Sequence, residues 1–139
     1  MFLILRFIYS FLVLCTLLSC TAAPRFAHFE ISKSVNYQVL TDRTKIFPAD
    51  YQYQETGIIF YPGGFVHPTA YIPLLSNIAS QGYRIIIAHM PLDLAVLDQA
   101  KAQALIKDYP EIENWVIAGH SLGGAMAAEQ VKQYPEAFS

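Results

Sequence analysis

The chain has little charge, little cysteine and no cluster of histidines. Only 14% of its 139 residues are charged and the net charge is −2, so the composition gives no attraction to nucleic acid. The four histidines lie apart, without the spacing of metal ligands, and we expect neither a metal ion nor another cofactor. Both cysteines, Cys15 and Cys20, fall within the first twenty residues, so the remainder of the chain has no disulfide to form. The apolar fraction of 54% suffices for the core of about one domain.

The first twenty residues have the pattern of an export signal. Arg6 and the amino terminus carry positive charge, and the apolar stretch 7–18 is shorter than the roughly 20 residues of a membrane-spanning helix. The tripeptide Leu-Leu-Ser at 17–19 precedes Cys20, which resembles the lipobox of bacterial lipoproteins. We therefore expect an exported protein that a lipid on Cys20 anchors to the membrane of the cell envelope. A secreted or periplasmic protein with an ordinary signal peptide, an uncleaved anchor and a buried helix are the alternatives.

The next segment, 21–56, is expected to supply edge strands and a loop. Residues 26–31 are rich in β-favouring side chains, and apolar residues alternate with polar ones over 34–40, which predicts one or two strands at the edge of a sheet. Pro48 and the polar run that follows it predict a loop.

From residue 57 onward, short apolar runs alternate with longer helical patterns. Buried strands are predicted at 57–61, 84–88 and 115–118, and helices at 69–81, 92–109 and 122–134. Thr69 is placed to cap the first helix, and Gly82 is placed to end it. This alternation predicts an α/β fold with a mostly parallel sheet and helices on both faces.

The third strand-to-helix junction carries a candidate catalytic motif. Residues 119–123 read Gly-His-Ser-Leu-Gly, between an apolar strand and an alanine-rich helix. That context is typical of a nucleophile elbow, in which a serine stands on a strained turn above the sheet. Small residues at Gly119 and Gly123 let the turn approach its neighbours closely, and the N–H of Leu122 is a candidate oxyanion donor for an attack by Ser121. The alternative is a glycine-rich turn that is only structural or binds phosphate.

A second glycine-containing loop follows the first buried strand. Residues 61–68 read Tyr-Pro-Gly-Gly-Phe-Val-His-Pro, and the second oxyanion donor of such sites comes from the loop at this position. Gly64 and Phe65 are the candidate donors. The alternative is a tight Pro-Gly turn that merely links strand to helix.

Together these motifs resemble the α/β-hydrolase family, in particular dienelactone hydrolases and small esterases, over about residues 56–135. The resemblance rests on Tyr61-Pro62-Gly63-Gly64, Gly82-Tyr83, Met90-Pro91-Leu92, Trp115 and Gly119-His120-Ser121-Leu122-Gly123-Gly124. It implies a triad of serine, acid and histidine that hydrolyses carboxylic esters or related small acyl substrates, with Ser121 as the nucleophile. It also implies an oxyanion hole of Leu122 with Gly64 or Phe65, and a supporting role for His120 in the elbow.

The rest of the triad does not follow in the expected order. The 18 residues after Ser121 contain Glu129 and Glu136 but neither histidine nor aspartate. His67 and His89 fall near strand ends, and either is a candidate substitute base. We expect 57–139 to be a partial hydrolase domain that stops after the nucleophile helix. The elbow strand would then be a sheet edge that is open to self-association.

Three functions are compatible with this pattern. The first is a serine hydrolase whose remaining catalytic groups lie outside the chain. The second is a catalytically inactive lipoprotein that binds a ligand or partner, and the third is the remnant of a truncated gene.

Overall fold

The computed structural model describes residues 30–50 and 53–139 of the chain. Its elements in chain order are β1 (Val35–Val39), β2 (Arg43–Pro48), β3 (Thr56–Tyr61), the 3₁₀ turn η2 (Pro68–Tyr71), α2 (Ile72–Ala79), β4 (Arg84–Ala88), the 3₁₀ turns η3 (Pro91–Asp93) and η4 (Ala95–Leu97), α3 (Lys101–Lys107), β5 (Asn114–Gly119), α4 (Leu122–Gln133) and the 3₁₀ turn η5 (Pro135–Ala137). The expected export signal, the lipidation site Cys20 and most of the expected strand 26–31 lie outside the described residues. Glu30 and Ile31, which are described, are not in a strand.

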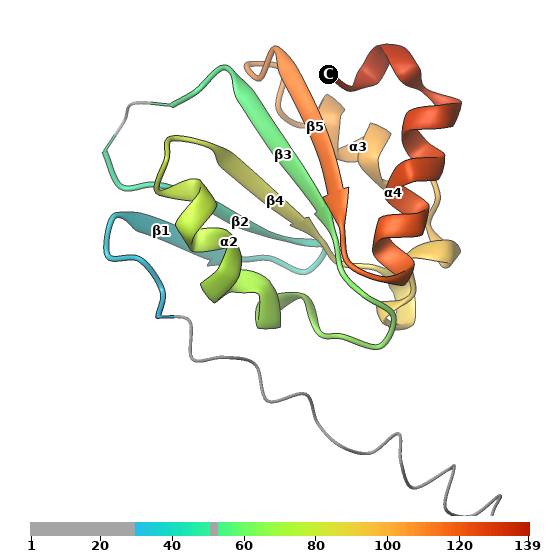
Figure 1. The fold of residues 1–139 in the computed structure, drawn as a ribbon, viewed down its shortest axis with the longest axis horizontal. Helices are drawn as coiled ribbons and strands as arrows, with labels where there is room; N and C mark the ends of the chain where they lie inside the picture. The colour runs from blue at the N-terminus through green and yellow to red at the C-terminus, as the bar shows by residue number, and fades with distance from the viewer. Residues whose placement is uncertain (1–29, 51–52) are drawn as a thin grey trace, which may run out of the picture.

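The five strands form one mixed sheet in the order β1-β2-β4-β3-β5 (Figure 1). Strands β4, β3 and β5 are parallel, whereas β1 and β2 join the sheet as an antiparallel hairpin. In the centre, Ile59 of β3 pairs with Ile86 of β4 on one side and with Ile117 of β5 on the other. The predicted α/β fold with a mostly parallel sheet is confirmed.

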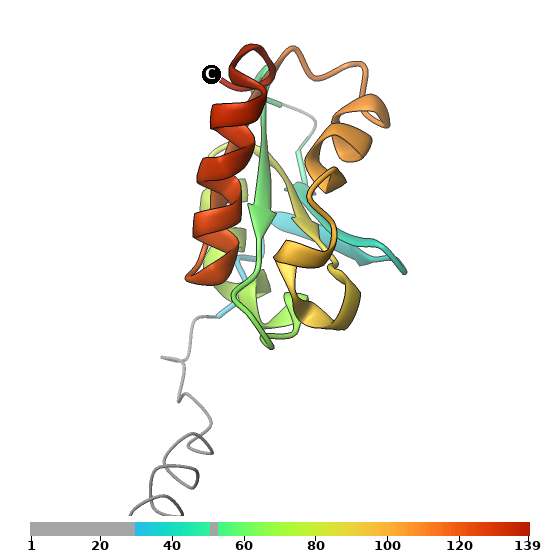
Figure 2. The same ribbon diagram turned by 90° about the vertical axis from the view of Figure 1, so that its right-hand side faces the viewer.

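Helices cover both faces of the sheet, as the alternation of strands and helices predicts. On one face, Phe60 and Ile85 pack in a cluster with Leu75 of α2. On the other, Ile59 and Ile86 pack with residues of α3, and Met126 of α4 joins that cluster. In Figure 2, α3 and α4 stand in front of the sheet with β3 visible between them. Strands buried from both sides read as continuous apolar runs, which is why 84–88 stood out in the sequence.

The helix expected over 92–109 is wrong. The chain instead forms the turns η3 and η4 and only then α3, which spans seven residues. Leu92 and Asp93 have left-handed backbone with φ of 53° and 55°, which no α-helix can contain. Ala95 of η4 is nevertheless buried in the same cluster as Leu105 of α3.

The helix expected over 69–81 is shorter than predicted and begins differently. Residues 68–71 form η2, whose first turn is capped by the side chain of His67 rather than by Thr69, and α2 runs from Ile72 to Ala79. Gly82 ends the segment as predicted, with φ of 101°.

The loop predicted from Pro48 onward begins too early, since Pro48 is the last residue of β2. Burial alternates along β2, with Thr44, Ile46 and Pro48 buried and their neighbours partly exposed.

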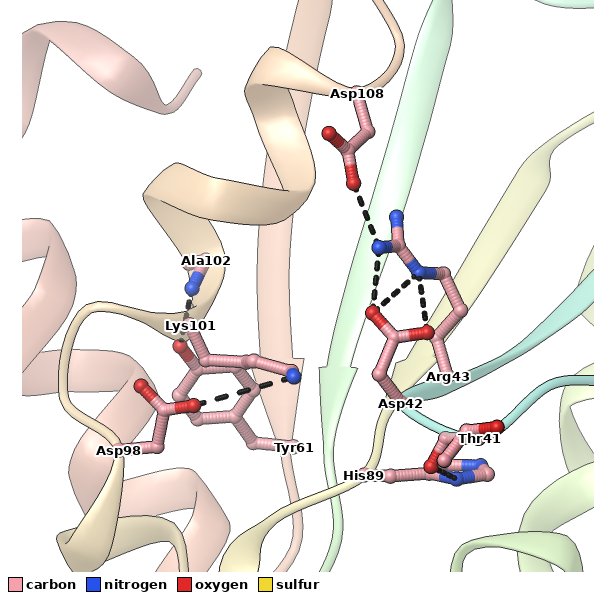
Figure 3. A network of polar contacts seen from close by, with 9 residues as sticks. All are labelled: Thr41, Asp42, Arg43, Tyr61, His89, Asp98, Lys101, Ala102 and Asp108. Atoms are coloured by element: carbon pink, nitrogen blue, oxygen red, sulfur yellow. Dashed lines mark hydrogen bonds and ion pairs between the residues drawn. The ribbon is translucent and has the colours of Figure 1, made fainter.

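Tyr61 connects the end of β3 to the start of α3 (Figure 3). Its side chain is fully buried, and its hydroxyl oxygen accepts the Ala102 N–H at 2.9 Å. Burial raises the pKa of Tyr61 to about 12, so the phenol is neutral at physiological pH. Ala102 lies in the first turn of its helix, where backbone N–H groups have no partner within the helix.

We expect Tyr61→Phe to lower the free energy of unfolding by about 1–3 kcal/mol, because the buried Ala102 N–H loses its acceptor. Tyr134→Phe is the matched control, since Tyr134 is partly exposed and its hydroxyl makes no hydrogen bond within the described residues; its effect should stay below about 0.5 kcal/mol. Urea unfolding followed by circular dichroism measures both. Equal effects of the two substitutions would rule out the capping role.

Strand β5 forms one edge of the sheet within the described residues, because it pairs there with β3 alone. After α4 and η5 the chain returns to the start of this strand, on the side away from β3 (Figure 1). There the Ser139 N–H donates to the Trp115 carbonyl oxygen at 2.8 Å, and Phe138 has extended backbone. No described helix is long and apolar enough to cross a membrane.

Candidate active site

Ser121 occupies the turn between β5 and α4 in strained backbone. Its φ is 51° and its ψ is −121°, a combination that side-chain-bearing residues rarely adopt. Such strain costs about 1–3 kcal/mol and persists only where the surrounding structure enforces it. The side chain is exposed, and its hydroxyl makes no hydrogen bond with any described residue. This is the geometry that presents a serine oxygen to an incoming molecule.

Two glycines of the motif are required by close contacts between backbone segments. A Cβ on Gly119 would lie 2.5 Å from the backbone carbon of Gly123. A Cβ on Gly123 would lie 2.2 Å from the Tyr61 carbonyl oxygen and 2.3 Å from that of Pro62. Real Cβ contacts are never this short, so the tight turn, the start of α4 and the end of β3 fit together only without these side chains.

His120 contacts the loop after β3 through Tyr71. Its Nδ1 lies 3.0 Å from the Tyr71 hydroxyl oxygen, which in turn accepts the Gly63 N–H at 2.9 Å. A Cβ on Gly63 would lie 2.7 Å from Nδ1. Tyr71 therefore joins the loop after β3 to the elbow.

The structure distinguishes between the two candidate oxyanion donors of this loop. The Phe65 N–H donates to the Asp93 carbonyl oxygen at 2.9 Å, so it is already used. The Gly64 N–H makes no hydrogen bond within the described residues, and a Cβ at Gly64 would lie 3.2 Å from the Leu122 side chain. Leu122 is the first residue of α4, where backbone N–H groups lack helical partners. The free N–H groups of Gly64 and Leu122 are thus on adjoining segments beside Ser121.

The turn whose Asp93 carbonyl oxygen accepts the Phe65 N–H has strained backbone. Leu92 and Asp93, which are consecutive, and Phe65 all have left-handed backbone. The side chains of Leu92 and Phe65 project into solvent, with exposed fractions of 79% and 80%. Asp93 was not a candidate site residue from the sequence, and neither was Tyr71, since nothing in their local patterns indicates a partner so distant in the chain.

Neither substitute base is hydrogen bonded to Ser121 within the described residues. The Nδ1 of His89 lies 3.3 Å from the Thr41 carbonyl oxygen (Figure 3). That oxygen can only accept, so Nδ1 carries the proton and Nε2 accepts the Thr44 hydroxyl at 2.8 Å. Burial lowers the pKa of His89, which favours this neutral form. The Nδ1 of His67 is engaged with the Thr69 hydroxyl at 2.8 Å.

The two carboxylates after the elbow lie on α4 and in η5. Glu129 accepts a hydrogen bond from Gln133 one turn along α4 and pairs with Lys132. Glu136 lies in η5, beyond α4. The described residues contain no group of three or more histidine, cysteine or acidic side chains that would hold a metal ion.

A strand, a strained serine turn and a helix on a doubly covered parallel sheet define the architecture of the α/β hydrolases. The family model described as "Alpha/beta hydrolase family" matches residues 57–137, more than half of the chain. The chain therefore belongs to the α/β-hydrolase family, which confirms the family predicted from the sequence. A comparison with proteins of curated function finds no match.

Solved structures with the same fold include several esterases and lipases. A hormone-sensitive lipase from a metagenome library superposes with a TM-score of 0.64 at 16% identity, over 92% of this chain and 52% of that one. A thermostable esterase from Pseudomonas putida gives 0.61 at 15% identity, over 78% and 42%. Brefeldin A esterase, a bacterial homologue of human hormone-sensitive lipase, gives 0.56 at 14% identity, over 84% and 39%. The chain thus spans about half the length of these proteins or less.

Proposed function

We propose that the chain carries the nucleophile and the oxyanion hole of a serine hydrolase that acts on carboxylic esters or related acyl compounds. The observation that supports this most is the backbone of Ser121, which is held in a strained turn while its hydroxyl stays exposed and unbonded. A purely structural turn at this position would gain from glycine, because glycine adopts positive φ without strain. The esterase and lipase names among the solved structures of this fold agree with the proposed chemistry.

In the proposed reaction, the Ser121 oxygen forms a bond to the acyl carbon while its proton passes to a general base. The carbonyl π electrons move to oxygen, and the N–H groups of Leu122 and Gly64 stabilise the resulting oxyanion. Collapse of this intermediate breaks the bond to the leaving alcohol, which takes up the proton. Water then hydrolyses the acyl-enzyme by the same sequence of steps.

We place the general base and its acidic partner outside the described residues. His67, His89 and His120 each have ring nitrogens engaged with other groups, and no described side chain is hydrogen bonded to the Ser121 hydroxyl. Serine without a base is a weak nucleophile, and loss of a triad member leaves only a residual rate. The proposed function thus assigns this chain the nucleophile part of the site.

A second candidate function is binding without hydrolysis. It is favoured by one observation, namely that the Ser121 hydroxyl has no hydrogen-bond partner that would activate it within the described residues. In that case the elbow and the free N–H groups would hold the acyl or carboxylate group of a ligand.

A fluorophosphonate reagent, which forms a covalent bond to the serine oxygen and places its phosphoryl oxygen in the oxyanion hole, tests the proposal. We expect slow labelling of the wild-type protein at Ser121, because the oxyanion hole alone supports a residual rate, and we expect Ser121→Ala to lose at least about 99% of that labelling, since the attacking oxygen is gone. Ser80→Ala is the control, because the Ser80 hydroxyl donates to the Asn77 carbonyl oxygen of its own helix and makes no other hydrogen bond within the described residues. Intact-protein mass spectrometry measures the added mass. Labelling that persists in Ser121→Ala contradicts the assignment, and a folded wild-type protein that is never labelled favours binding alone.

A further inference from the structure

A hollow lies on the face of the sheet that α3 covers, away from Ser121. It has a volume of about 210 Å³, and its lining includes Lys45 and Phe47 of β2, Arg84 and Ile86 of β4, and Tyr109 and Ile112, which follow α3. Nothing in the elbow or in the loop after β3 contributes to it.

The strand register explains why these side chains meet. Lys45 pairs with Ile86, and Arg84 is two residues along the same strand, so the three side chains share one face. Arg84 pairs with Gly57 at the beginning of β3, whereas the elbow follows the carboxyl end of β5. The hollow and Ser121 therefore lie toward opposite ends of the parallel strands.

The hollow has an excess of positive charge. Arg84 is partly neutralised, since its Nη1 pairs with the Glu111 carboxylate at 3.1 Å and its guanidinium lies over the Tyr53 ring at 5.3 Å. Its Nε is buried and makes no hydrogen bond with any described residue. Lys45 is half-buried and forms no ion pair with any described residue.

The remaining walls are apolar and aromatic. Ile86 and Ile112 are almost fully buried, and Phe47 and Tyr109 are half-buried beside them. The volume is below the 300–1,000 Å³ typical of sites for drug-sized ligands. It therefore limits the occupant to about ten non-hydrogen atoms, which is one ring with a short side chain.

We propose that this hollow is a binding site for a small aromatic carboxylate. The ring packs on Phe47, Ile86 and Ile112. The carboxylate pairs with the ammonium group of Lys45. A cationic ligand is disfavoured because Glu111 is already paired with Arg84, while Lys45 has no counter-ion among the described residues.

The test is a titration of the full chain with phenylacetate, followed by amide chemical shifts in ¹H–¹⁵N spectra. We expect saturable shifts at β2, at the start of β4 and at residues 109–112, with a Kd between about 0.1 and 3 mM, as suits a ligand of ten atoms. Phenylacetamide, which has the same shape without the charge, should bind about tenfold more weakly, and phenethylamine more weakly still.

Variants separate this site from the elbow. Lys45→Met keeps most of the apolar stem and should weaken phenylacetate binding about tenfold, and Lys45→Arg should restore most of it. Lys107→Met, an exposed lysine at the end of α3, is the control and should bind like the wild type. Ser121→Ala should also bind normally, so this result does not depend on the proposed hydrolase.

Three outcomes would overturn the assignment. They are the absence of shifts up to about 10 mM in a protein whose spectrum is that of a folded chain, equal binding of the acid and the amine, and shifts confined to the elbow.

Discussion

Replacing Gly123 by alanine is expected to lower the free energy of unfolding by about 3 kcal/mol or more. The added carbon would overlap two backbone oxygens at the end of β3, those of Tyr61 and Pro62, and backbone atoms in the centre of a sheet have little freedom to move. Overpacking costs about 1–3 kcal/mol even where flexible side chains can yield. Urea unfolding of the full chain, followed by circular dichroism, measures the loss.

Gly124→Ala provides the matched control. At this position the nearest atom to an added Cβ is the Gly119 carbonyl oxygen at 3.2 Å, a tight contact that a small shift relieves. Alanine also gains about 1 kcal/mol over glycine in a helix. The net change should therefore stay within about 1 kcal/mol of the wild type. If Gly123→Ala is tolerated equally well, the close packing of the elbow against β3 is not what holds Ser121 in place.

Tyr71→Phe is expected to destabilise the protein by about 2–3 kcal/mol and to slow any labelling of Ser121. Phenylalanine keeps the ring, which is buried at 5% exposure against Phe60, but removes the oxygen that Gly63 and His120 share. The Gly63 N–H is then buried without an acceptor, which accounts for about 1–3 kcal/mol. The loop that carries Gly64 also loses its link to the elbow. Urea unfolding and the rate of fluorophosphonate labelling measure the two effects.

Tyr37→Phe is the control for this substitution. Tyr37 lies on β1 with 47% of its surface exposed, and its hydroxyl makes no hydrogen bond within the described residues. We expect a change below about 0.5 kcal/mol and an unaltered labelling rate. A Tyr71→Phe protein as stable as this control would show that the shared hydroxyl contributes nothing to the loop.

The parts of the fold that are regular in sequence could be predicted, and the irregular parts could not. The run of isoleucines in β4 is apolar because both faces are covered, and this signal needs no knowledge of the partner strands. The segment 92–109 is also apolar, with spacing close to that of a helix, yet Leu92 and Asp93 take left-handed backbone that breaks it. That conformation places the Asp93 carbonyl oxygen where it accepts the N–H of Phe65, 28 positions earlier. A contact between residues so far apart leaves no local pattern in the sequence.

The candidate site divides in the same way. The residue types at 119–123 determine the turn locally, so the sequence sufficed to select Ser121 and both glycines. The choice between Gly64 and Phe65 depends on which N–H is already bonded, and that depends on a turn contributed by another part of the chain. The role of Tyr71 likewise arises from a contact across 49 positions, which no local pattern encodes.

The side of β5 that no described strand covers could pair with a segment of the same chain or with a second copy. The hydrogen bond between Ser139 and Trp115 favours the first of these. Pairing two segments of one chain costs the conformational entropy of closing the loop between them, and this cost rises only slowly with the length of the loop. Here that closure is already made through α4 and η5, next to the first residues of the edge strand. A segment joined to Ser139 would thus meet β5 at an effective concentration of the order of millimolar, whereas a second copy is present only at its bulk concentration. Dilution would therefore suppress association between copies and leave pairing within one chain unchanged.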